Sequence, residues 1–300
     1  MLGFSTMKID KISELPPMDT LAARPAGSPA AGSPAAESSS AGSPAAPAAL
    51  SLEGVSFAWP GGQQVFRDLS LQVRAGEFVA ILGPSGCGKS TLLNLLSGFQ
   101  RPDQGTIRIN GRAVMPEMPE LGYVFQSPNL FPWLSVLDNV RFGLRMEKRL
   151  APAEQIERAQ SYLALVGLAD AGAKLPHQLS GGMQQRVALA RTLALEPGVL
   201  LMDEPFAALD AINRNTMNEE TLRLWSELGQ TTIFITHDID EAVFLADRVV
   251  VMGLAPEGMR AVFDIDLPRP RSLAVTRRLP QFLDYRNALM DQITLAMQDT

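Results

Sequence analysis

The chain has 300 residues, 46% of them hydrophobic, and a formal net charge of −6. The acidic balance argues against a general nucleic-acid binder, which usually carries a basic face, and the single cysteine excludes an internal disulfide. Two histidines argue against a histidine-rich metal site, and no apolar run approaches the length of about 18 residues that spans a bilayer.

Residues 1–50 differ in composition from the rest of the chain. They are rich in Ala, Pro, Ser and Gly, and the segment Gly-Ser-Pro-Ala-Ala recurs at 27–31, 32–36 and 42–46. Such a segment buries too little apolar surface to offset its ordering entropy, so we expect a flexible tail, with a regulatory or docking role as the alternative. Residues 1–17 lack the apolar core of an export signal, so we expect a cytosolic protein.

Ordered structure is predicted from Leu52 onwards. Residues 55–57 and 65–73 alternate apolar and polar side chains on either side of the turn residues 60–62, which is typical of an antiparallel pair. Beyond them, short apolar strands alternate with helical patterns, which favours a parallel sheet covered by helices. The further strands are predicted at 78–82, 106–109, 121–125, 199–202 and 232–235, and the helices at 92–96, 153–166, 183–195, 217–228 and 281–298.

A glycine-rich stretch lies between the predicted strand 78–82 and the predicted helix 92–96. It fits the pattern G-x-x-x-x-G-K-[ST] of a phosphate loop without a mismatch. Backbone angles closed to other residues at Gly83, Gly86 and Gly88 would let successive N–H groups turn inward around a phosphate, and the helix N-terminus adds partial positive charge. A glycine turn without a ligand is the alternative, but the complete pattern favours nucleotide binding. The predicted binding residues are Gly83, Pro84, Ser85, Gly86, Cys87, Gly88, Lys89, Ser90 and Thr91.

Three residues of this loop have specific expectations. Lys89 should reach the outer phosphates, and the Ser90 hydroxyl should hold Mg²⁺. Because Cys87 lies inside the loop, a thiol reagent should block ATP binding sterically, and bound ATP should protect the thiol. A small filler at a variable position is the simpler reason for the presence of Cys87.

Two apolar strands end in polar groups suited to phosphate chemistry. Ligands of open α/β sheets bind at the carboxyl ends of strands, so Asp203 should lie beside the phosphate loop and hold Mg²⁺ directly or through water. Glu204 is placed to polarise an attacking water as general base, with an ordinary acidic turn as the alternative. His237 follows the strand 232–235, and the residues alone leave open whether it contacts the γ-phosphate or is structural.

The segment Leu-Ser-Gly-Gly-Met-Gln-Gln-Arg at 179–186 opens another predicted helix. Ser180 and the flexible backbone of Gly181 and Gly182 stand at its N-terminus, which makes it a second candidate phosphate binder. The residues alone do not say why one chain needs two.

Together these motifs resemble the ATP-binding subunit of an ABC transporter over residues 52–271, and they occur in the order of that family. The resemblance implies an ATPase with a P-loop NTPase α/β fold: a RecA-like parallel sheet, an antiparallel β subdomain and a helical subdomain that carries the signature. The implied organisation is a tail at 1–50, an ATP-binding domain at 51–271 with its helical subdomain at about 127–195, and a helical tail at 272–300.

The resemblance also implies roles for single residues. In that family two nucleotide-binding domains pair head to tail, so Ser180, Gly181 and Gly182 would contact the ATP of a second copy. Gln126 would sense Mg²⁺ and the attacking water, and Asp210 would cross the dimer interface. The implied catalytic residues are Lys89, Gln126, Glu204 and His237, and the implied Mg²⁺ ligands are Ser90, Gln126 and Asp203. An aromatic residue should stack on adenine, and we predict Trp59, with Phe57 as the alternative.

Finer features resemble importers of nitrate, sulfonates and taurine. The stretch that follows Asp264 in this sequence is short, so we do not expect the regulatory barrel that sugar and polyamine importers carry. Two positions depart from the pattern of these importers. Ala207 stands where they commonly have glycine, and Glu196-Pro197-Gly198 stands where they commonly have Asp-Pro. These departures weaken the subfamily assignment and remove no catalytic group. The segments that carry the subfamily resemblance are 129–136, 236–242 and 267–271.

The implied partners are a second copy in a homodimer, two membrane permease subunits and, indirectly, a solute-binding protein, at the cytoplasmic face of the inner membrane and without nucleic acid. The groove around Gln126 and 131–134 would receive a short permease helix, with local packing as the alternative. An exporter subunit and a soluble ABC ATPase are the competing functions; a single cassette without a long insertion argues against the latter. The solute cannot be read from this sequence.

Overall fold

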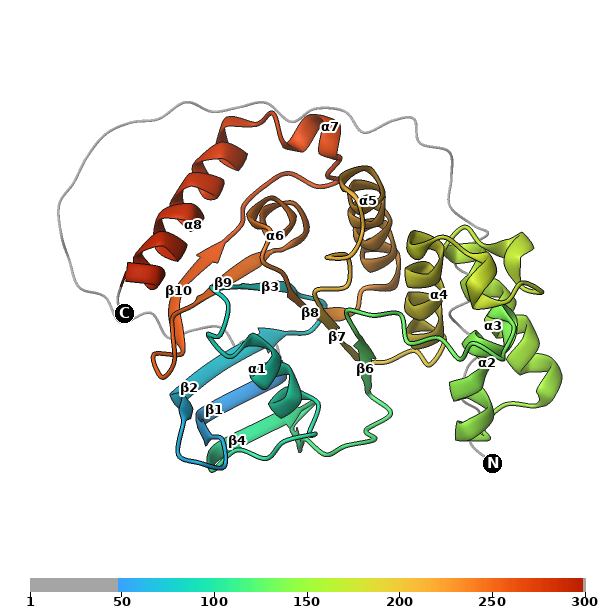
Figure 1. Cartoon of the computed structure of the whole chain (residues 1–300), viewed down its shortest axis with the longest axis horizontal. Coiled ribbons are helices and arrows are strands. Elements are labelled where there is room, and N and C mark those ends of the chain that lie inside the picture. Colours follow the sequence, from blue (N-terminus) through green and yellow to red (C-terminus); the bar gives the residue numbers. More distant parts are fainter. Residues whose placement is uncertain (1–47, 299–300) are drawn as a thin grey trace, which may run out of the picture. The chain divides into compact units, whose positions relative to one another are not determined.

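Residues 48–298, which the computed structural model describes, form two β-sheets with helices packed against them (Figure 1). The smaller sheet is antiparallel, with the strand order β2-β1-β4-β5. The larger has the order β10-β9-β3-β8-β7-β6, and all its pairs are parallel except β10 with β9. The strands of the smaller sheet are β1 (Ala48–Ala58), β2 (Gln64–Arg74), β4 (Gln104–Ile109) and β5 (Arg112–Ala113). Those of the larger are β3 (Phe78–Leu82), β6 (Leu121–Val124), β7 (Val199–Asp203), β8 (Thr231–Ile235), β9 (Arg248–Met252) and β10 (Met259–Asp264).

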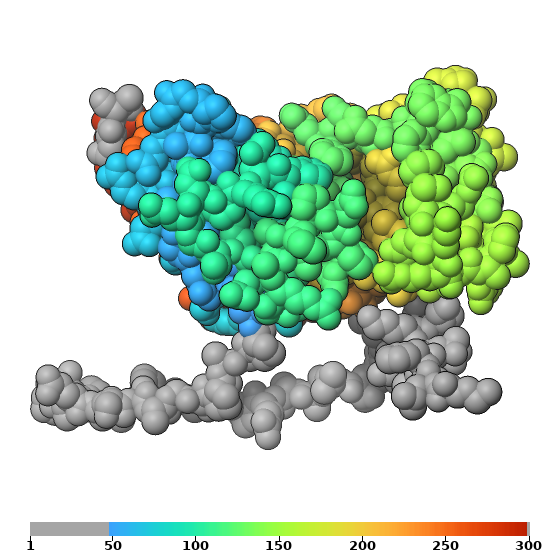
Figure 2. Space-filling view, turned by 90° about the horizontal axis from the view of Figure 1, so that it is seen from below, coloured from blue at the N-terminus to red at the C-terminus, as the bar shows by residue number. Residues whose placement is uncertain are grey.

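The helices connect and cover these strands. They are α1 (Lys89–Leu96), α2 (Val136–Glu147), α3 (Pro152–Leu165), α4 (Gly181–Leu193), α5 (Ala211–Leu228), α6 (Ile239–Leu245), α7 (Leu273–Thr276) and α8 (Pro280–Gln298), with 3-10 turns at Ala169–Ala171 and Pro176–Gln178. Figures 1 and 2 both place α2 and α3 at one end of the described unit and the antiparallel strands toward the other. No helix within residues 48–298 is long and apolar enough to cross a membrane.

The strand β3 separates two hydrophobic cores. Phe78, Ala80 and Leu82 belong to the core beneath the helices α2 to α6 and α8, whereas Val79 and Ile81 belong to the core shared with α1 and the antiparallel sheet. Successive side chains of a strand point to opposite faces, so a central strand covered on both faces is apolar at every position. The same central strand leads directly into the phosphate loop, which fixes that loop to the most buried part of the fold.

Most predicted elements are present, with two differences. The first strand begins at Ala48 rather than near Leu52, because Ala48 pairs with Arg74 of β2 and Leu50 is fully buried. Residues 48–50 of the predicted tail therefore belong to β1, and the rest of that tail lies outside the described residues. The helices α2, α6 and α7 and the strands β5 and β10 were not predicted, since short amphipathic or edge elements give a weak periodic signal. The strand β9 was not named among the predicted elements either, although its apolar run at 249–252 has the length of a strand.

Candidate active site

The phosphate loop joins β3 to α1, and its glycines are required for different reasons. Gly86 and Gly88 have φ angles of 83° and 101°, in the left-handed region that favours glycine. Gly83 does not have a positive φ, which corrects the expectation for that residue. A Cβ on Gly83 would instead lie 2.8 Å from Cys87 Sγ and 3.0 Å from the carbonyl oxygen of Met252, so close packing requires glycine there.

The N-terminus of α1 is arranged to receive an anion. Its N-cap, Gly88, supplies no side-chain hydrogen bond to the first helical N–H groups, which leaves those donors for a ligand. Lys89 Nζ donates to the carbonyl oxygens of Gly83 and Pro84 at 2.8 and 3.0 Å, and thus lies over the loop. Ser90 is exposed beside it, while Thr91 is buried beneath the loop.

Cys87 is less accessible than the sequence suggested. Only 1% of its surface is exposed, and this burial raises the pKa of its thiol despite the nearby charge of Lys89. Both effects slow the reaction of a thiol, since the thiolate is the nucleophile. Cys87 fills space under Gly83, which favours the simpler of the two explanations given for its presence.

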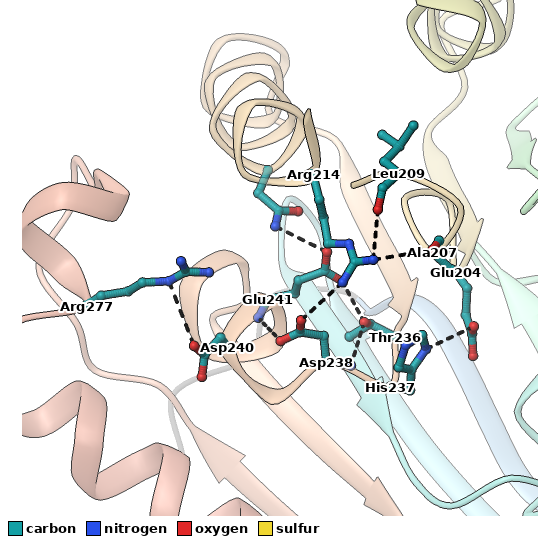
Figure 3. Close-up of polar contacts among 11 residues, drawn as sticks. Glu204, Ala207, Leu209, Arg214, Thr236, His237, Asp238, Asp240, Glu241 and Arg277 are labelled. Atoms are coloured by element: carbon teal, nitrogen blue, oxygen red, sulfur yellow. Dashed lines mark hydrogen bonds and ion pairs between the residues drawn. The ribbon is translucent and has the colours of Figure 1, made fainter. Parts of the chain in front are cut away.

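The carboxyl ends of β7 and β8 bring Glu204 and His237 together. These strands are parallel neighbours, and Glu204 N donates to the carbonyl oxygen of Ile235 at 3.0 Å. Glu204 Oε2 lies 3.1 Å from His237 Nδ1 (Figure 3). Glu204 has a φ of 41°, an uncommon angle for a non-glycine residue and one that is found at functional sites. His237 is exposed, so its ring is open to a ligand as well as to Glu204.

Asp203 lies half-buried at the end of β7. Burial and the adjacent Glu204 charge raise its pKa, and the Tyr123 hydroxyl lies 3.5 Å from its Oδ2. A cation beside these two carboxylates would relieve their repulsion. Within residues 48–298 no three His, Cys, Asp or Glu side chains cluster as a metal cage. One carboxylate and a hydroxyl suit Mg²⁺, which takes oxygen ligands and keeps waters and substrate phosphates in its shell.

Gln126 follows β6, the neighbour of β7, and its side chain is exposed. Its loop is fastened to α4 on both sides. Gln185 donates to the carbonyl oxygen of Phe125 at 3.3 Å, and the Arg191 guanidinium donates to the carbonyl oxygens of Pro128 and Asn129 at 2.9 and 2.8 Å. Sequence reasoning had not singled out Gln185 or Arg191 as loop anchors, because nothing in a helical pattern reports which backbone a side chain meets.

The signature segment is the N-terminus of α4. Ser180 is its N-cap, and Ser180 Oγ accepts a hydrogen bond from Met183 N at 3.4 Å. Neither Gly181 nor Gly182 has a positive φ. A Cβ on either would meet only ordinary contacts among the described residues, Leu209 Cδ2 at 3.8 Å and Asn213 Oδ1 at 3.9 Å. Packing within the described part of the chain therefore does not require glycine at these two positions.

Asp210 is the N-cap of α5, where its Oδ1 accepts hydrogen bonds from Ile212 N and Asn213 N, each at 3.1 Å. These hydrogen bonds lower the pKa of Asp210. Its predicted place across a dimer interface stays a prediction. The two candidate adenine-stacking rings pack edge to face, with centroids 5.1 Å apart. Phe57 is buried in the core and Trp59 is partly exposed, which favours Trp59.

Comparison with known proteins agrees with this geometry. The family model for the ABC transporter matches residues 66–207. The chain is 44% identical over 241 residues to a nitrate import ATP-binding protein of Synechococcus elongatus, covering 79% of this chain and 88% of that relative. It is 46% identical over 250 residues to a taurine import ATP-binding protein of Pseudomonas aeruginosa, covering 81% and 95%. It is also 42% identical over 249 residues to a bicarbonate transport ATP-binding protein of Synechocystis, covering 81% and 88%.

Two solved structures share the fold. One is a dimeric ATP-binding cassette in a post-hydrolysis state bound to ADP and Pi, with a TM-score of 0.63 and 31% identity over 73% of this chain and all of that one. The other, from Clostridium perfringens, is part of an ABC transporter complex, with a TM-score of 0.68 and 29% identity over 84% of this chain and 99% of that one. The motifs, the fold and these relatives lead to one conclusion: the chain belongs to the ATP-binding subunits of ABC transporters.

Proposed function

We propose that the chain is the ATP-hydrolysing subunit of an importer for a small anion of the nitrate, sulfonate or taurine kind. The single observation that carries hydrolysis is the contact of 3.1 Å between Glu204 and His237 at the sheet edge where the phosphate loop also lies. Relatives named for nitrate, taurine and bicarbonate transport support the importer and its class of solute.

In the proposed reaction the chain binds the triphosphate through the backbone of the phosphate loop, Lys89 and the N-terminus of α1. Glu204 orients the attacking water and takes its proton, and His237 holds Glu204 and contacts the γ-phosphate. Ser90, Asp203 and Gln126 would hold Mg²⁺, which neutralises charge on the phosphates when bound. Trp59 would stack on the adenine ring.

The second half of the site is proposed to come from a second copy in a head-to-tail dimer. The glycines Gly181 and Gly182 support this, because no close contact within residues 48–298 explains them. Glycine near a helix N-terminus lets a ligand approach the backbone closely. Ser180 and these glycines would then contact the γ-phosphate of the ATP held by the other copy. Asp210 would lie at the interface between the two copies.

The remaining partners are proposed to be two permease subunits, reached at the cytoplasmic face of the inner membrane. Trp133 is 74% exposed and Phe125 is 40% exposed, and they lie on either side of Gln126 in the loop that follows β6. Aromatic residues are enriched at protein interfaces, which supports a partner contact at this loop. A solute-binding protein would deliver the anion to the permease and not to this chain.

The decisive test of hydrolysis is Glu204→Gln, which removes the base and keeps the size of the side chain. ATP binding should be retained while turnover falls by about 10²–10⁴-fold, the usual contribution of a general base. Glu227→Gln, at a surface carboxylate that pairs with Arg223 at 2.8 Å, is the control and should keep full turnover. Near wild-type hydrolysis by Glu204→Gln would exclude Glu204 as the base.

The importer is tested by reconstituting the chain with its permease subunits in vesicles. A cognate binding protein loaded with nitrate, a sulfonate or taurine should stimulate ATP hydrolysis, whereas the unloaded binding protein should stimulate it less. Transport outward without any binding protein would instead identify an exporter.

A further inference from the structure

Arg214 lies between two loops that the proposed mechanism uses. It sits in the first turn of α5, four residues after the N-cap Asp210. Its Nη2 donates to the carbonyl oxygen of Leu209 at 2.9 Å and to that of Ala207 at 3.3 Å. Its Nη1 lies 3.7 Å from Asp238 Oδ2 (Figure 3). One planar guanidinium thus spans the turn that follows Glu204 and the loop that carries His237.

Asp238 is held from both sides. Its Oδ1 accepts from Glu241 N at 3.2 Å and so caps α6, while its own N–H donates to Thr236 Oγ1 at 3.0 Å. His237 stands between Thr236 and Asp238, so the orientation of its backbone depends on both neighbours. A change in the position of Asp238 would therefore be felt at the histidine ring.

The contacts of Arg214 form one connection between α5 and the loop of His237, here called the first tie, and a second tie joins the same two segments. Asn218, one turn after Arg214 on α5, donates to Glu241 Oε1 at 3.2 Å, and Thr236 Oγ1 donates to Glu241 Oε2 at 2.6 Å. Residues four apart on a helix lie on one face, so Arg214 and Asn218 hold the same loop. Asn218 is fully buried and Glu241 is 5% exposed, which makes this second tie the rigid one.

The first tie is the more adaptable of the two. The side chain of Arg214 keeps 26% of its surface exposed, and its contact with Asp238 is longer than a hydrogen bond. The turn that it holds also borders the signature, because a Cβ on Gly181 would lie 3.8 Å from Leu209 Cδ2. Arg214 thus connects the turn beside the signature to the loop of His237.

We propose that Arg214 is a positioning residue for hydrolysis, which couples the Ala207–Leu209 turn to the loop of His237 and so sets the Glu204–His237 contact. The proposal rests on the proposed roles of Glu204 and His237. It assigns to Arg214 no contact with nucleotide. Its loss should lower the rate of the chemical step and leave the phosphate loop intact.

The test compares Arg214→Met with Arg214→Lys in the full chain. Arg214→Met should lower kcat by about 10–100-fold, the size expected when a catalytic group is displaced by about 1 Å, with ATP affinity within about twofold of wild type. Arg214→Lys should recover part of the rate. An ammonium can donate to the same oxygens, but it is a compact point charge and lacks the planar fork of donors of a guanidinium. Arg223→Met is the matched control: Arg223 also lies on α5 and also donates to a carbonyl oxygen, that of Leu165, and its variant should keep full kcat.

A second comparison separates positioning from general loss of structure. In a His237→Ala background, Arg214→Met should cause no further loss of kcat, since the effect acts through His237. Asp238→Asn, which keeps an N-cap on α6 but removes the charge facing Arg214, should reproduce part of the loss even if Arg214→Met fails to fold.

Two results would overturn the proposal: a kcat within about twofold of wild type for both Arg214→Met and Asp238→Asn, or the same fold-loss with and without His237. Such results, with the kcat of His237→Ala itself reduced but still measurable, would leave the proposed function standing. Full activity of His237→Ala would instead remove His237 from that function, so the two failures can be told apart.

Discussion

Two helix N-termini of this chain have phosphate-binding sequences, and they are built differently. The N-terminus of α1 is enclosed: a Cβ on Gly88 would lie 2.6 Å from Val65 Cγ1 and 2.8 Å from the ring of Phe66. The N-terminus of α4 is open, with Ser180 and Gly181 exposed and no close neighbour for a Cβ on Gly182 among the described residues. The first N-terminus is packed against its own chain, whereas the second is the one that we propose faces a second copy.

The glycines of the phosphate loop and those of the signature meet different requirements. In the phosphate loop, backbone angles and close packing within the chain demand glycine. In the signature, neither demand is present among the described residues, since both glycines have ordinary φ angles and no close neighbour for a Cβ. A glycine that the packing of the described residues does not require points to a requirement outside that packing, and the proposed head-to-tail dimer would supply it.

The largest effect should come from Gly88→Ala. Alanine at a φ of 101° costs about 1–2 kcal/mol, and the clash with Val65 and Phe66 adds about 1–3 kcal/mol of overpacking. The free energy of unfolding, measured with denaturant, should fall by the sum, and ATP binding should be lost. Gly86 also has a positive φ, but a Cβ there would meet nothing within 4 Å. Gly86→Ala therefore measures the backbone cost alone and should lower the free energy of unfolding less than Gly88→Ala does. Equal losses in the two variants would contradict a clash at Gly88.

Gly182→Ala should give the opposite pattern. The free energy of unfolding should change by less than about 1 kcal/mol, and ATP should bind the phosphate loop as in wild type. ATP-driven dimerisation, measured by size-exclusion chromatography in a Glu204→Gln background, should be lost, and hydrolysis should fall more than about tenfold as one contact made in the transition state disappears. Normal dimerisation and turnover would mean that the signature needs no close approach.

Trp59→Ala should act on the enclosed site at its adenine end. Base stacking on an aromatic ring is worth about 1–3 kcal/mol, so ATP affinity should fall by about tenfold while the affinity for inorganic triphosphate stays unchanged. Phe57→Ala, at the buried neighbour, should instead lower the free energy of unfolding by about 3–5 kcal/mol. If Phe57→Ala were stable and selectively weakened ATP binding, the assignment would be reversed.

The smallest effect concerns Cys87. Its pKa is raised above 9.0 by burial, so at each pH a smaller fraction is thiolate than in an ordinary thiol. Alkylation by iodoacetamide should be slower than that of a free cysteine and should keep rising with pH beyond 9.0. Rapid labelling at neutral pH would show that the loop opens. The N-terminus of α1 would then be accessible to solvent, as the N-terminus of α4 is.

Much of the site was predictable because its motifs are local. The phosphate loop, the acidic end of β7 and the signature are short runs whose spacing specifies a turn or a helix start. The glycine roles were predictable only in part: the pattern identified Gly83, but its requirement comes from Cys87 and Met252, which lies far along the chain. The anchors Gln185, Arg191 and Arg214 were not predictable, because a guanidinium or amide on a helix gives no signal of the carbonyl it will meet.

The sequence alone determined the family and most of the order of the elements, and it predicted a bound nucleotide and the reactive groups, since these follow from short patterns and from hydrophobic periodicity. Only the tertiary structure decided which groups touch. The parallel register of β7 and β8 sets Glu204 against His237, and the packing of α5 places one arginine between the two loops that bear them. Such contacts join residues far apart in the chain, and their distances depend on how the strands and helices pack.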